Sequence, residues 1–308
     1  MRASPPERWQ VVGRFKLDFA QLSQLIINGA AGGCIYGIIA LGFVLIYKAT
    51  EMVNFAQGEF MMLGGFVAFT LIAGFGVNYW LGGLLAVMTM AAFGFLLDAV
   101  VLRRVIGQPQ FAVVMLTLGL GFIFRAFAGI TFGYAAVTFA TPFTNQVARF
   151  GNFVIGLDSL SIIAGTVLLC AVLYFFFSHT RLGVAMQASS QNQLAAYYMG
   201  IPVRTVFSLI WAISAGVAAV AGVLLAPVSL LDVNMGFLGI KAFAAAVLGG
   251  FGSIPGALVG GIVIGIVEQL SGYYLPAGFQ EVTANIMLLA VLILRPQGLF
   301  AEAVRKKV

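Results

Sequence analysis

Long runs of apolar residues, separated by short polar stretches, fill most of the chain from residue 22 to residue 295. The runs span 22–47, 58–76, 79–101, 110–133, 159–178, 206–226, 237–249, 255–272 and 281–295. An α-helix needs about 20 apolar residues to cross the hydrocarbon core of a bilayer, and most of these runs approach that length. The seventh and ninth are short, so they are tilted, extended by neighbouring residues, or incomplete crossings. The pattern predicts an all-α fold, a polytopic transmembrane bundle of about eight or nine spans.

The same pattern divides the chain into a polar N-terminal tail over 1–21, a single transmembrane domain over 22–300 and a basic tail over 301–308. Composition agrees, because 61% of the residues are hydrophobic and 8% are charged, whereas about a quarter are charged in a soluble domain. The polar stretches leave no room for a separate soluble domain. The opening MRASPPERWQ has prolines and a glutamate where a signal peptide would need an apolar run, so we expect none.

Three basic clusters indicate how the chain is oriented. They are Arg103–Arg104, the stretch from His179 to Arg204, and the stretch from Arg295 to Lys307. With nine crossings all three fall on one side, which the positive-inside rule makes cytoplasmic. The net charge of +6 therefore reflects membrane orientation rather than nucleic-acid binding. The same count puts the tail over 1–21 outside, although it has four basic and two acidic residues. Either the rule is weak for this tail, or a segment near 48–76 is re-entrant; we favour an outside N-terminus.

The cysteines and the single histidine offer no metal or redox chemistry. Cys34 and Cys170 both lie inside apolar runs, which predicts small core residues rather than a disulfide. His179 cannot assemble a histidine metal site alone. We expect no metal and no cofactor in this chain.

The stretch IYKATEMVNFAQGEF gathers polar side chains at the edge of the second run. They are Lys48, Glu51, Asn54, Gln57 and Glu59, and Gly58 stands among them as a candidate for a break in the helix near residues 51–60. A broken helix at membrane depth exposes backbone groups that need protein or water partners, as in the substrate sites of transporters. The stretch either lines or gates a path, or it is an ordinary cytoplasmic loop; composition alone does not choose.

Four more charged residues lie inside apolar runs. Asp98 is near the end of its run, where snorkelling or a local ion pair explains it. Arg125 lies deeper and needs a carboxylate or backbone carbonyl partner, which the sequence does not identify. Lys241 and Glu268 lie in neighbouring runs, so we expect them to pair and brace the fold, with a substrate role as the alternative.

The stretch AVLGGFGSIPGALVGGIVIG is rich in glycine. Gly256 and Gly260 form a small-xxx-small pair that lets helix backbones approach closely. Gly250 begins a tight turn, and Ser253 caps the helix that Pro255 opens. We therefore expect tight packing of an antiparallel helix pair rather than a phosphate cradle. No G-x-x-x-x-G-K-[ST] motif occurs, so the chain has no P-loop of its own.

The sequence TRLGVAMQASSQNQLAAYYMGIPVR, residues 180–204, is a sizeable polar interruption in the second half of the chain. It predicts a short helix, with Ser189 and Ser190 as candidate caps and with Gly200 and Pro202 as its stop. No obvious catalytic group lies in it.

Four motifs, in order, resemble the permeases of branched-chain amino acid ABC transporters. They are NGAAGGCIYGIIALGFVLIYKATEMVNFAQGEFMMLGGF, TRLGVAMQASS…AAYYMGI, GIKAFAAAVLGGFGSIPGALVGG and LRPQGLF, which together cover about residues 22–300. The resemblance implies an inner-membrane subunit of a binding-protein-dependent importer. Its partners would be a second homologous permease, two cytoplasmic ATPases that use ATP and Mg, and a periplasmic substrate-binding protein. The chain itself would then be a transport subunit in contact with membrane lipid, not an enzyme.

The resemblance also implies that the loop over 179–206 is a coupling helix that docks on the ATPase. Its small residues would let it seat closely, and Gly200 would turn the chain back to the membrane. The expected coupling residues are Arg181, Gln187, Ala188, Asn192, Ala195, Ala196, Gly200 and Ile201. Members of the family often have arginine at position 187 and aspartate at position 192, and this chain lacks both charges. Docking here would therefore depend on packing and neutral hydrogen bonds, or on Arg181 and Arg204.

The polar stretch around residue 57 matches the family as well. By this resemblance we expect Asn54, Gln57, Gly58 and Glu59 to line or gate the translocation path. Gln57 stands where histidine is frequent; it keeps hydrogen-bonding ability but does not titrate near neutral pH.

Several functions remain open at this point. The first is a permease half for branched-chain or other neutral amino acids, and the second is a permease of the same family for urea, short amides or aromatic acids. A passive channel would not need the 180–204 loop. A membrane-embedded enzyme lacks support, because the sequence has no H-E-x-x-H and no G-x-S-x-G motif.

Overall fold

A computed structural model describes residues 19–105, 108–144, 146–150 and 153–300 of the chain. Seven helices in this part are long and apolar enough to cross a membrane, and two shorter apolar helices accompany them. The α-helices are α1 (Phe19–Thr50), α2 (Gln57–Phe69), α3 (Tyr79–Val100), α4 (Gln110–Phe132), α5 (Leu157–His179), α6 (Arg181–Gln191), α7 (Gln193–Tyr198), α8 (Val203–Leu225), α9 (Leu238–Gly249), α10 (Ile254–Tyr274) and α11 (Phe279–Leu294). The predicted helical membrane bundle is confirmed.

Short elements extend or join these helices. A π-helical turn, η2 (Thr70–Gly74), continues α2, and 3-10 turns η3 (Leu102–Arg104) and η4 (Met235–Phe237) follow α3 and precede α9. The hairpin β1 (Val147–Phe150) and β2 (Phe153–Gly156) is antiparallel and lies between the apolar runs over 110–133 and 159–178.

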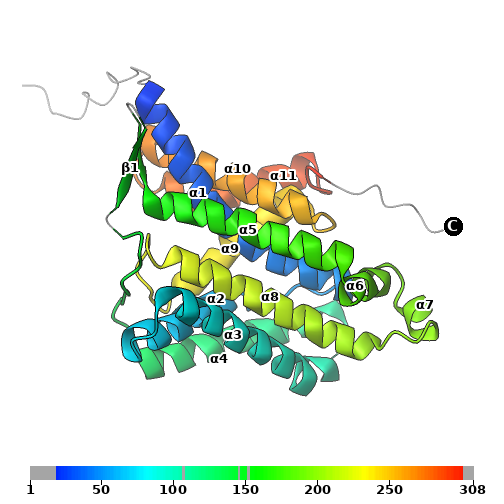
Figure 1. The fold of residues 1–308 in the computed structure, drawn as a ribbon. Coiled ribbons are helices and arrows are strands. Elements are labelled where there is room, and N and C mark those ends of the chain that lie inside the picture. Colours follow the sequence, from blue (N-terminus) through cyan, green and yellow to red (C-terminus); the bar gives the residue numbers. More distant parts are fainter. Residues whose placement is uncertain (1–18, 106–107, 145, 151–152, 301–308) are drawn as a thin grey trace, which may run out of the picture.

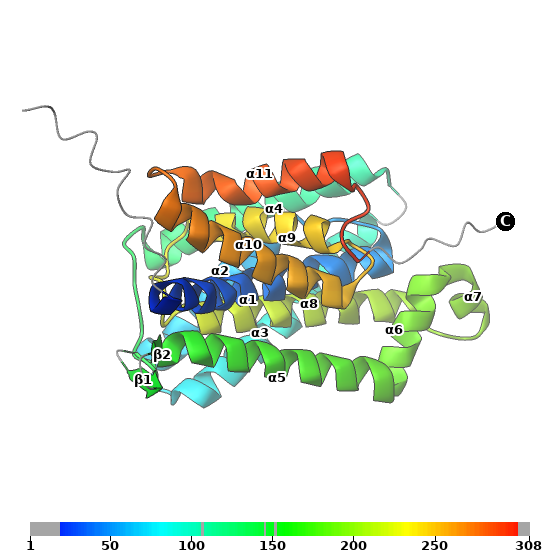
Figure 2. The same cartoon turned by 90° about the horizontal axis from the view of Figure 1, so that it is seen from above.

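The bundle has two distinct ends. The helices α6 and α7 lie at one end and the hairpin β1–β2 at the other (Figure 1), and the view from above shows the same separation (Figure 2). We call these the α6–α7 end and the β1–β2 end. The helix α1 begins at the β1–β2 end, so the chain enters the bundle there. The predicted tails over 1–21 and 301–308 lie outside the described residues, except that 19–21 already belong to α1.

The three basic clusters all lie at the α6–α7 end, as far as their residues are described. Arg103 Nη2 donates to Ser208 Oγ, at 2.7 Å, in the second turn of α8. The segment after Arg295 returns to the end of α9, where Leu299 N donates to Leu248 O at 2.8 Å. The expectation that these clusters share one side therefore holds for the described residues.

Two helices, α2 and α9, begin in the middle of the bundle. Glu59, in the first turn of α2, lies beside Gly121, the central residue of α4. Gly239, in the first turn of α9, lies against Gly58. From this meeting point α2 runs toward the β1–β2 end and α9 toward the α6–α7 end, where Gly249 contacts Gly256. The short seventh apolar run is therefore a half-length helix, reached from α8 through a non-helical segment.

The predicted helix break near residues 51–60 is present, but Gly58 is not its cause. The chain leaves α1 at Thr50, Glu51 has a positive φ of 57°, and the helix resumes at Gln57. Gly58 lies inside the first turn of α2, where its missing side chain admits the backbone of Gly236. The prediction that Gly58 breaks the helix was wrong, because this glycine is required for close contact rather than for a turn.

Glycines hold α10 against two neighbours at once. On one face, a Cβ on Gly33 of α1 would lie 2.6 Å from the carbonyl oxygen of Gly261. On the other face, Gly256 and Gly260 contact the backbone of α9, as their spacing predicts. Gly250 ends α9 with a φ of 96°. The next helix starts as expected, because Ser253 Oγ accepts from Gly256 N at 3.1 Å.

Candidate functional site

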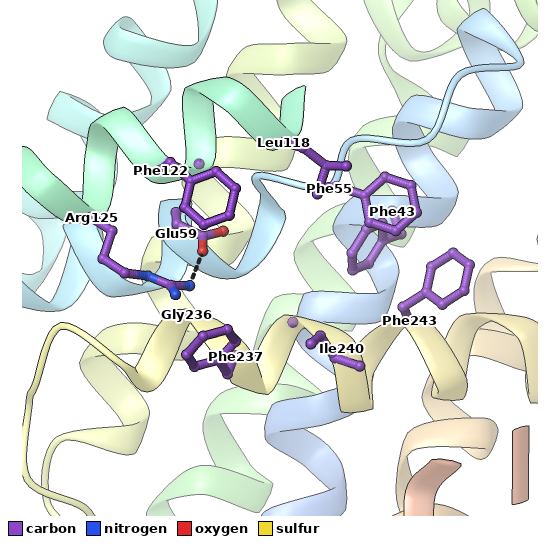
Figure 3. Close-up of a pocket in the computed structure, with 12 residues that line it drawn as sticks. Phe43, Phe55, Glu59, Leu118, Phe122, Arg125, Gly236, Phe237, Ile240 and Phe243 are labelled. Carbon is purple, nitrogen blue, oxygen red and sulfur yellow. Dashed lines mark hydrogen bonds and ion pairs between the residues drawn. The ribbon is translucent and has the colours of Figure 1, made fainter. Parts of the chain in front are cut away.

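A cavity of about 340 Å³ opens where α2 and α9 begin. Its wall is mostly aromatic and aliphatic, and its charged groups are one carboxylate and one guanidinium (Figure 3). The lining residues are Phe43, Phe55, Glu59, Leu118, Gly121, Phe122, Arg125, Gly236, Phe237, Gly239, Ile240 and Phe243. The cavity is therefore formed between the starts of α2 and α9 and the helices α1 and α4.

An ion pair crosses this cavity. Arg125 Nη2 lies 2.5 Å from Glu59 Oε1, and the two side chains are 18% and 8% exposed. The Arg125 guanidinium also lies over the Phe237 ring, 3.9 Å from its centroid. Arg125 therefore has the carboxylate partner that its depth requires, and that partner lies 66 residues away in the sequence. Because Glu59 is in the first turn of α2, the helix dipole also favours its negative charge.

Asn54 and Gln57 face the interior of the bundle rather than the cavity. They are 1% and 0% exposed, and Asn54 Nδ2 donates to Gln57 Oε1 at 3.1 Å. Gln57 Nε2 donates to Ser214 O at 3.3 Å, in the middle of α8. Of the four residues expected to line a path, Glu59 lines this cavity and Asn54, Gln57 and Gly58 do not; Asn54 and Gln57 hold the 51–56 segment in place. The inward position of Asn54 and Gln57 has a physical cause: a non-helical segment at membrane depth must satisfy its polar groups within the protein.

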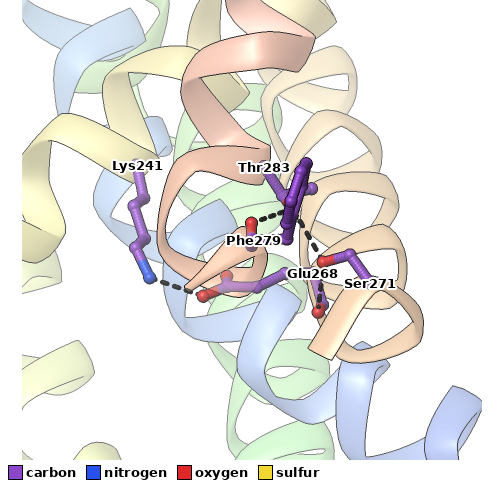
Figure 4. A network of polar contacts seen from close by, with 5 residues as sticks. All are labelled: Lys241, Glu268, Ser271, Phe279 and Thr283. Carbon is purple, nitrogen blue, oxygen red and sulfur yellow. Dashed lines mark hydrogen bonds and ion pairs between the residues drawn. The ribbon is translucent and has the colours of Figure 1, made fainter. Parts of the chain in front are cut away.

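A second ion pair joins α9 to α10. Lys241 Nζ lies 2.5 Å from Glu268 Oε1, so the predicted partners do meet (Figure 4). Next to them, the Ser271 and Thr283 hydroxyls lie 2.7 Å apart, and Ser271 Oγ donates to Glu268 O at 2.8 Å. This network connects α9, α10 and α11 and lies outside the cavity, which favours the bracing interpretation over the substrate interpretation.

Asp98 is buried instead of snorkelling to the surface. It is 1% exposed, and Ser208 Oγ donates to its Oδ2 at 2.6 Å. The same hydroxyl accepts from Arg103 Nη2. The local ion pair that we expected is therefore bridged by a serine from α8, and this serine could not be identified from the pattern of residues alone.

The polar loop forms two short helices instead of one. Thr180 Oγ1 caps α6 by accepting from Gly183 N at 3.0 Å, and Asn192 Oδ1 caps α7 by accepting from Ala195 N at 3.0 Å. Ser189 and Ser190 lie inside α6 and cap nothing, so that prediction was wrong. Asparagine interrupts helices easily because its side chain competes for backbone N–H groups. Gly200, with a φ of 83°, ends the unit as expected.

The expected coupling residues are divided between the surface and the interior of this unit. Arg181, Gln187, Asn192, Ala195 and Gly200 are exposed; Ala188 and Ile201 are half-buried. Ala196 is buried, at 4% exposure, and belongs to the interior of this unit. Gln187 Nε2 donates to Phe177 O at 3.1 Å, which ties α6 back to α5.

The most exposed side chains of α7 and of the residue after it were not among the coupling residues predicted from the sequence. These are Leu194, Tyr197, Tyr198 and Met199, at 69%, 67%, 81% and 83% exposure. Large apolar side chains on a polar loop were the available signal, because contiguous exposed apolar surface indicates an interaction site. We call these four residues the α7 surface.

Comparison with known proteins gives a family for this chain. Residues 25–295 match the family described as branched-chain amino acid transport system / permease component. The chain is 33% identical to the high-affinity branched-chain amino acid transport system permease protein LivH of Escherichia coli K12, over 94% of this chain and 99% of that protein. It is 32% identical to the corresponding permease BraD of Pseudomonas aeruginosa, over 92% and 97%. Among solved structures, PsaBC from Streptococcus pneumoniae matches 88% of this chain and 91% of that chain, with a TM-score of 0.47 and 16% identity.

Proposed function

Because the chain belongs to the family of permease components of branched-chain amino acid transport systems, we propose that it forms half of the translocation path of an ABC importer for these amino acids. The observation that carries the proposal is the match over residues 25–295. The near full-length similarity to LivH and BraD supports branched-chain substrates over urea, short amides or aromatic acids.

The second half of the path would come from a homologous permease that packs over the cavity. Arg125 lies about one turn past the centre of α4, and its side chain is 18% exposed. A charge at that depth is costly against lipid, so protein or a water-filled path must cover it. Exposed apolar side chains surround the opening, with Phe122 at 69% and Phe237 at 51% exposure. A partner on this face would enclose the cavity between two subunits.

ATP would drive this path through α6 and α7. Gln187 ties α6 to α5, and Gln193 Nε2 donates to Ala49 O at 3.3 Å, which ties α7 to α1. A displacement of the α7 surface would therefore be transmitted to α5, the span before the loop, and to α1. Closure of two ATPase subunits, holding ATP and Mg, would shift the spans between two packings. Coupling requires that ATP and the loaded binding protein favour the same packing.

The proposed function implies on which side of the membrane each end of the bundle lies. The α6–α7 end, with its basic clusters, would be cytoplasmic, and the β1–β2 end would face a periplasmic substrate-binding protein. The chain would be a multi-pass protein of the inner membrane. ATP hydrolysis would take place in the partner subunits, since this sequence has no P-loop.

ATPase activity of the complete complex in lipid nanodiscs tests the proposal. We expect stimulation by a leucine-loaded binding protein. Stimulation by urea, amides or aromatic acids but not by leucine would change the substrate, and absence of any associated ATPase would overturn the importer assignment. The double variant Tyr198→Ala/Met199→Ala should lower the stimulation about tenfold, because buried aromatic anchors dominate interfaces. The control is Tyr174→Ala in α5; this tyrosine is 71% exposed, against 81% for Tyr198, and its replacement should change nothing.

A further inference from the structure

We propose that the cavity binds the charged backbone of an α-amino acid by opening the Glu59–Arg125 ion pair, with Arg125 taking the carboxylate and Glu59 the ammonium group. This inference rests on the proposed function and adds a recognition step within the path. The substrate would replace one protein ion pair with two, so neither charge would lose its partner at membrane depth.

The geometry of the pair leaves room for this exchange. Arg125 meets Glu59 through one guanidinium nitrogen, Nη2. Its Nε is buried and has no hydrogen-bond partner among the described residues. A guanidinium has five N–H donors and binds carboxylates best with two of them in parallel. A substrate carboxylate can therefore use donors that the ion pair leaves unused. Phe237, stacked under the guanidinium, keeps it in position during the exchange.

The backbone around the cavity favours the same orientation of the substrate. The first turn of α9 lines the cavity through Gly239 and Ile240. A helix N-terminus carries partial positive charge and attracts carboxylates. Gly236 and Gly121 lie beside Glu59, so no side chain there blocks access to its carboxylate. The start of α9 thus adds to Arg125 in attracting a carboxylate, while the Glu59 carboxylate stays accessible to an ammonium group.

The rest of the cavity suits an apolar side chain. Phe43, Phe55 and Phe243 form one continuous aromatic cluster, with ring centroids 5.4–5.8 Å apart for the contacting pairs. Leu118 and Ile240 complete the wall. The volume of about 340 Å³ falls within the usual range of small-molecule pockets, about 300–1,000 Å³. A zwitterion with an aliphatic side chain matches this lining better than an amide or a sugar does.

The Lys241–Glu268 pair offers a matched comparison within the same chain. Its distance is also 2.5 Å, and it also lies inside the bundle. Neither of its residues lines the cavity described above, and beside it Ser271 Oγ donates to the backbone carbonyl oxygen of Glu268 and lies 2.7 Å from Thr283 Oγ1. Substrate binding should therefore depend on the first pair and not on the second.

Saturation-transfer difference NMR on the complete importer in nanodiscs, without its binding protein, tests the inference with L-leucine as the probe. We expect a leucine signal that isoamylamine and isocaproate, which lack the carboxylate and the amine, displace at least about tenfold less well than valine. The variant Glu59→Gln/Arg125→Gln should lose the signal, whereas Lys241→Gln/Glu268→Gln should keep it. Leu118→Trp, which fills the cavity and leaves both charges in place, should also lose the signal.

The outcomes separate this inference from the proposed function. No leucine signal in the wild type, equal displacement by the two analogues, or a signal that survives in Leu118→Trp would overturn the site. If the same preparation, once supplied with leucine-loaded binding protein, still shows ATPase stimulation, the importer assignment stands without this site. Loss of that stimulation in the wild type would instead overturn the proposed function. The analogue competition uses only the wild type, so it decides even if a variant fails to assemble.

Discussion

Gly58 and Gly239 lie against each other in the middle of the bundle, each in the first turn of a helix that begins there. A Cβ on Gly239 would lie 2.9 Å from the Cα of Gly58. The backbones of α2 and α9 thus meet with no side chain between them. This contact positions Glu59 beside Gly236 and creates the cavity.

Replacing Gly239 should therefore be costly. We expect Gly239→Ala to lower the free energy of unfolding by about 1–3 kcal/mol, because the added methyl group meets backbone that cannot move aside easily. Thermal unfolding of the purified chain in detergent measures this. The control is Gly32→Ala in α1, where nothing lies within 4 Å of a Cβ and alanine is the better helix former. Equal stability of the two variants would show that the close contact is not needed.

The meeting of α2 and α9 marks the limit of what the sequence predicts. Runs of apolar residues place nearly every helix, because a span must be apolar along its length. They do not show that α2 and α9 start at mid-depth, since this depends on contacts between residues such as Gln57 and Ser214, 157 positions apart. The Glu59–Arg125 pair could not be predicted from the sequence for the same reason. The Lys241–Glu268 pair was predictable, because the two lie in adjacent antiparallel helices.

Breaking the Lys241–Glu268 pair should destabilise the bundle more than removing both charges. Glu268→Gln leaves an ammonium group without its carboxylate, which we expect to cost about 3 kcal/mol. Lys241→Gln/Glu268→Gln should recover most of that loss, because neither residue then carries a buried charge. A double-mutant cycle by thermal unfolding checks this. Additive losses would mean that the two side chains do not interact.

Removing the charge of Glu59 should impair transport without impairing assembly. Glu59→Gln keeps the size and a carbonyl oxygen for Arg125, so packing is preserved while the ion pair is lost. We expect a drop in leucine uptake of about tenfold or more, with the complex still eluting as one species. Glu281→Gln, an exposed carboxylate in the first turn of α11, is the control and should transport normally. Unchanged uptake, or a complex that no longer assembles, would contradict a role for Glu59 in the path.

Asn192 should act as the N-cap of α7 rather than as a residue that contacts the ATPase. Asn192→Ala removes the acceptor for Ala195 N and should destabilise α7 by about 1 kcal/mol, whereas Asn192→Asp should retain the cap. Hydrogen exchange of the α7 amides measures the difference. Faster exchange in Asn192→Asp as well as in Asn192→Ala would contradict the cap, because an aspartate side chain can accept the same hydrogen bond from Ala195 N.

Uptake of labelled leucine into proteoliposomes tests the whole account most directly, with ATP inside and the leucine-loaded binding protein outside. An importer driven through α6 and α7 predicts uptake that requires both ATP and the binding protein, and that falls in Tyr198→Ala/Met199→Ala. Leucine flux that continues without ATP would contradict the account, because the chain would then form a passive channel.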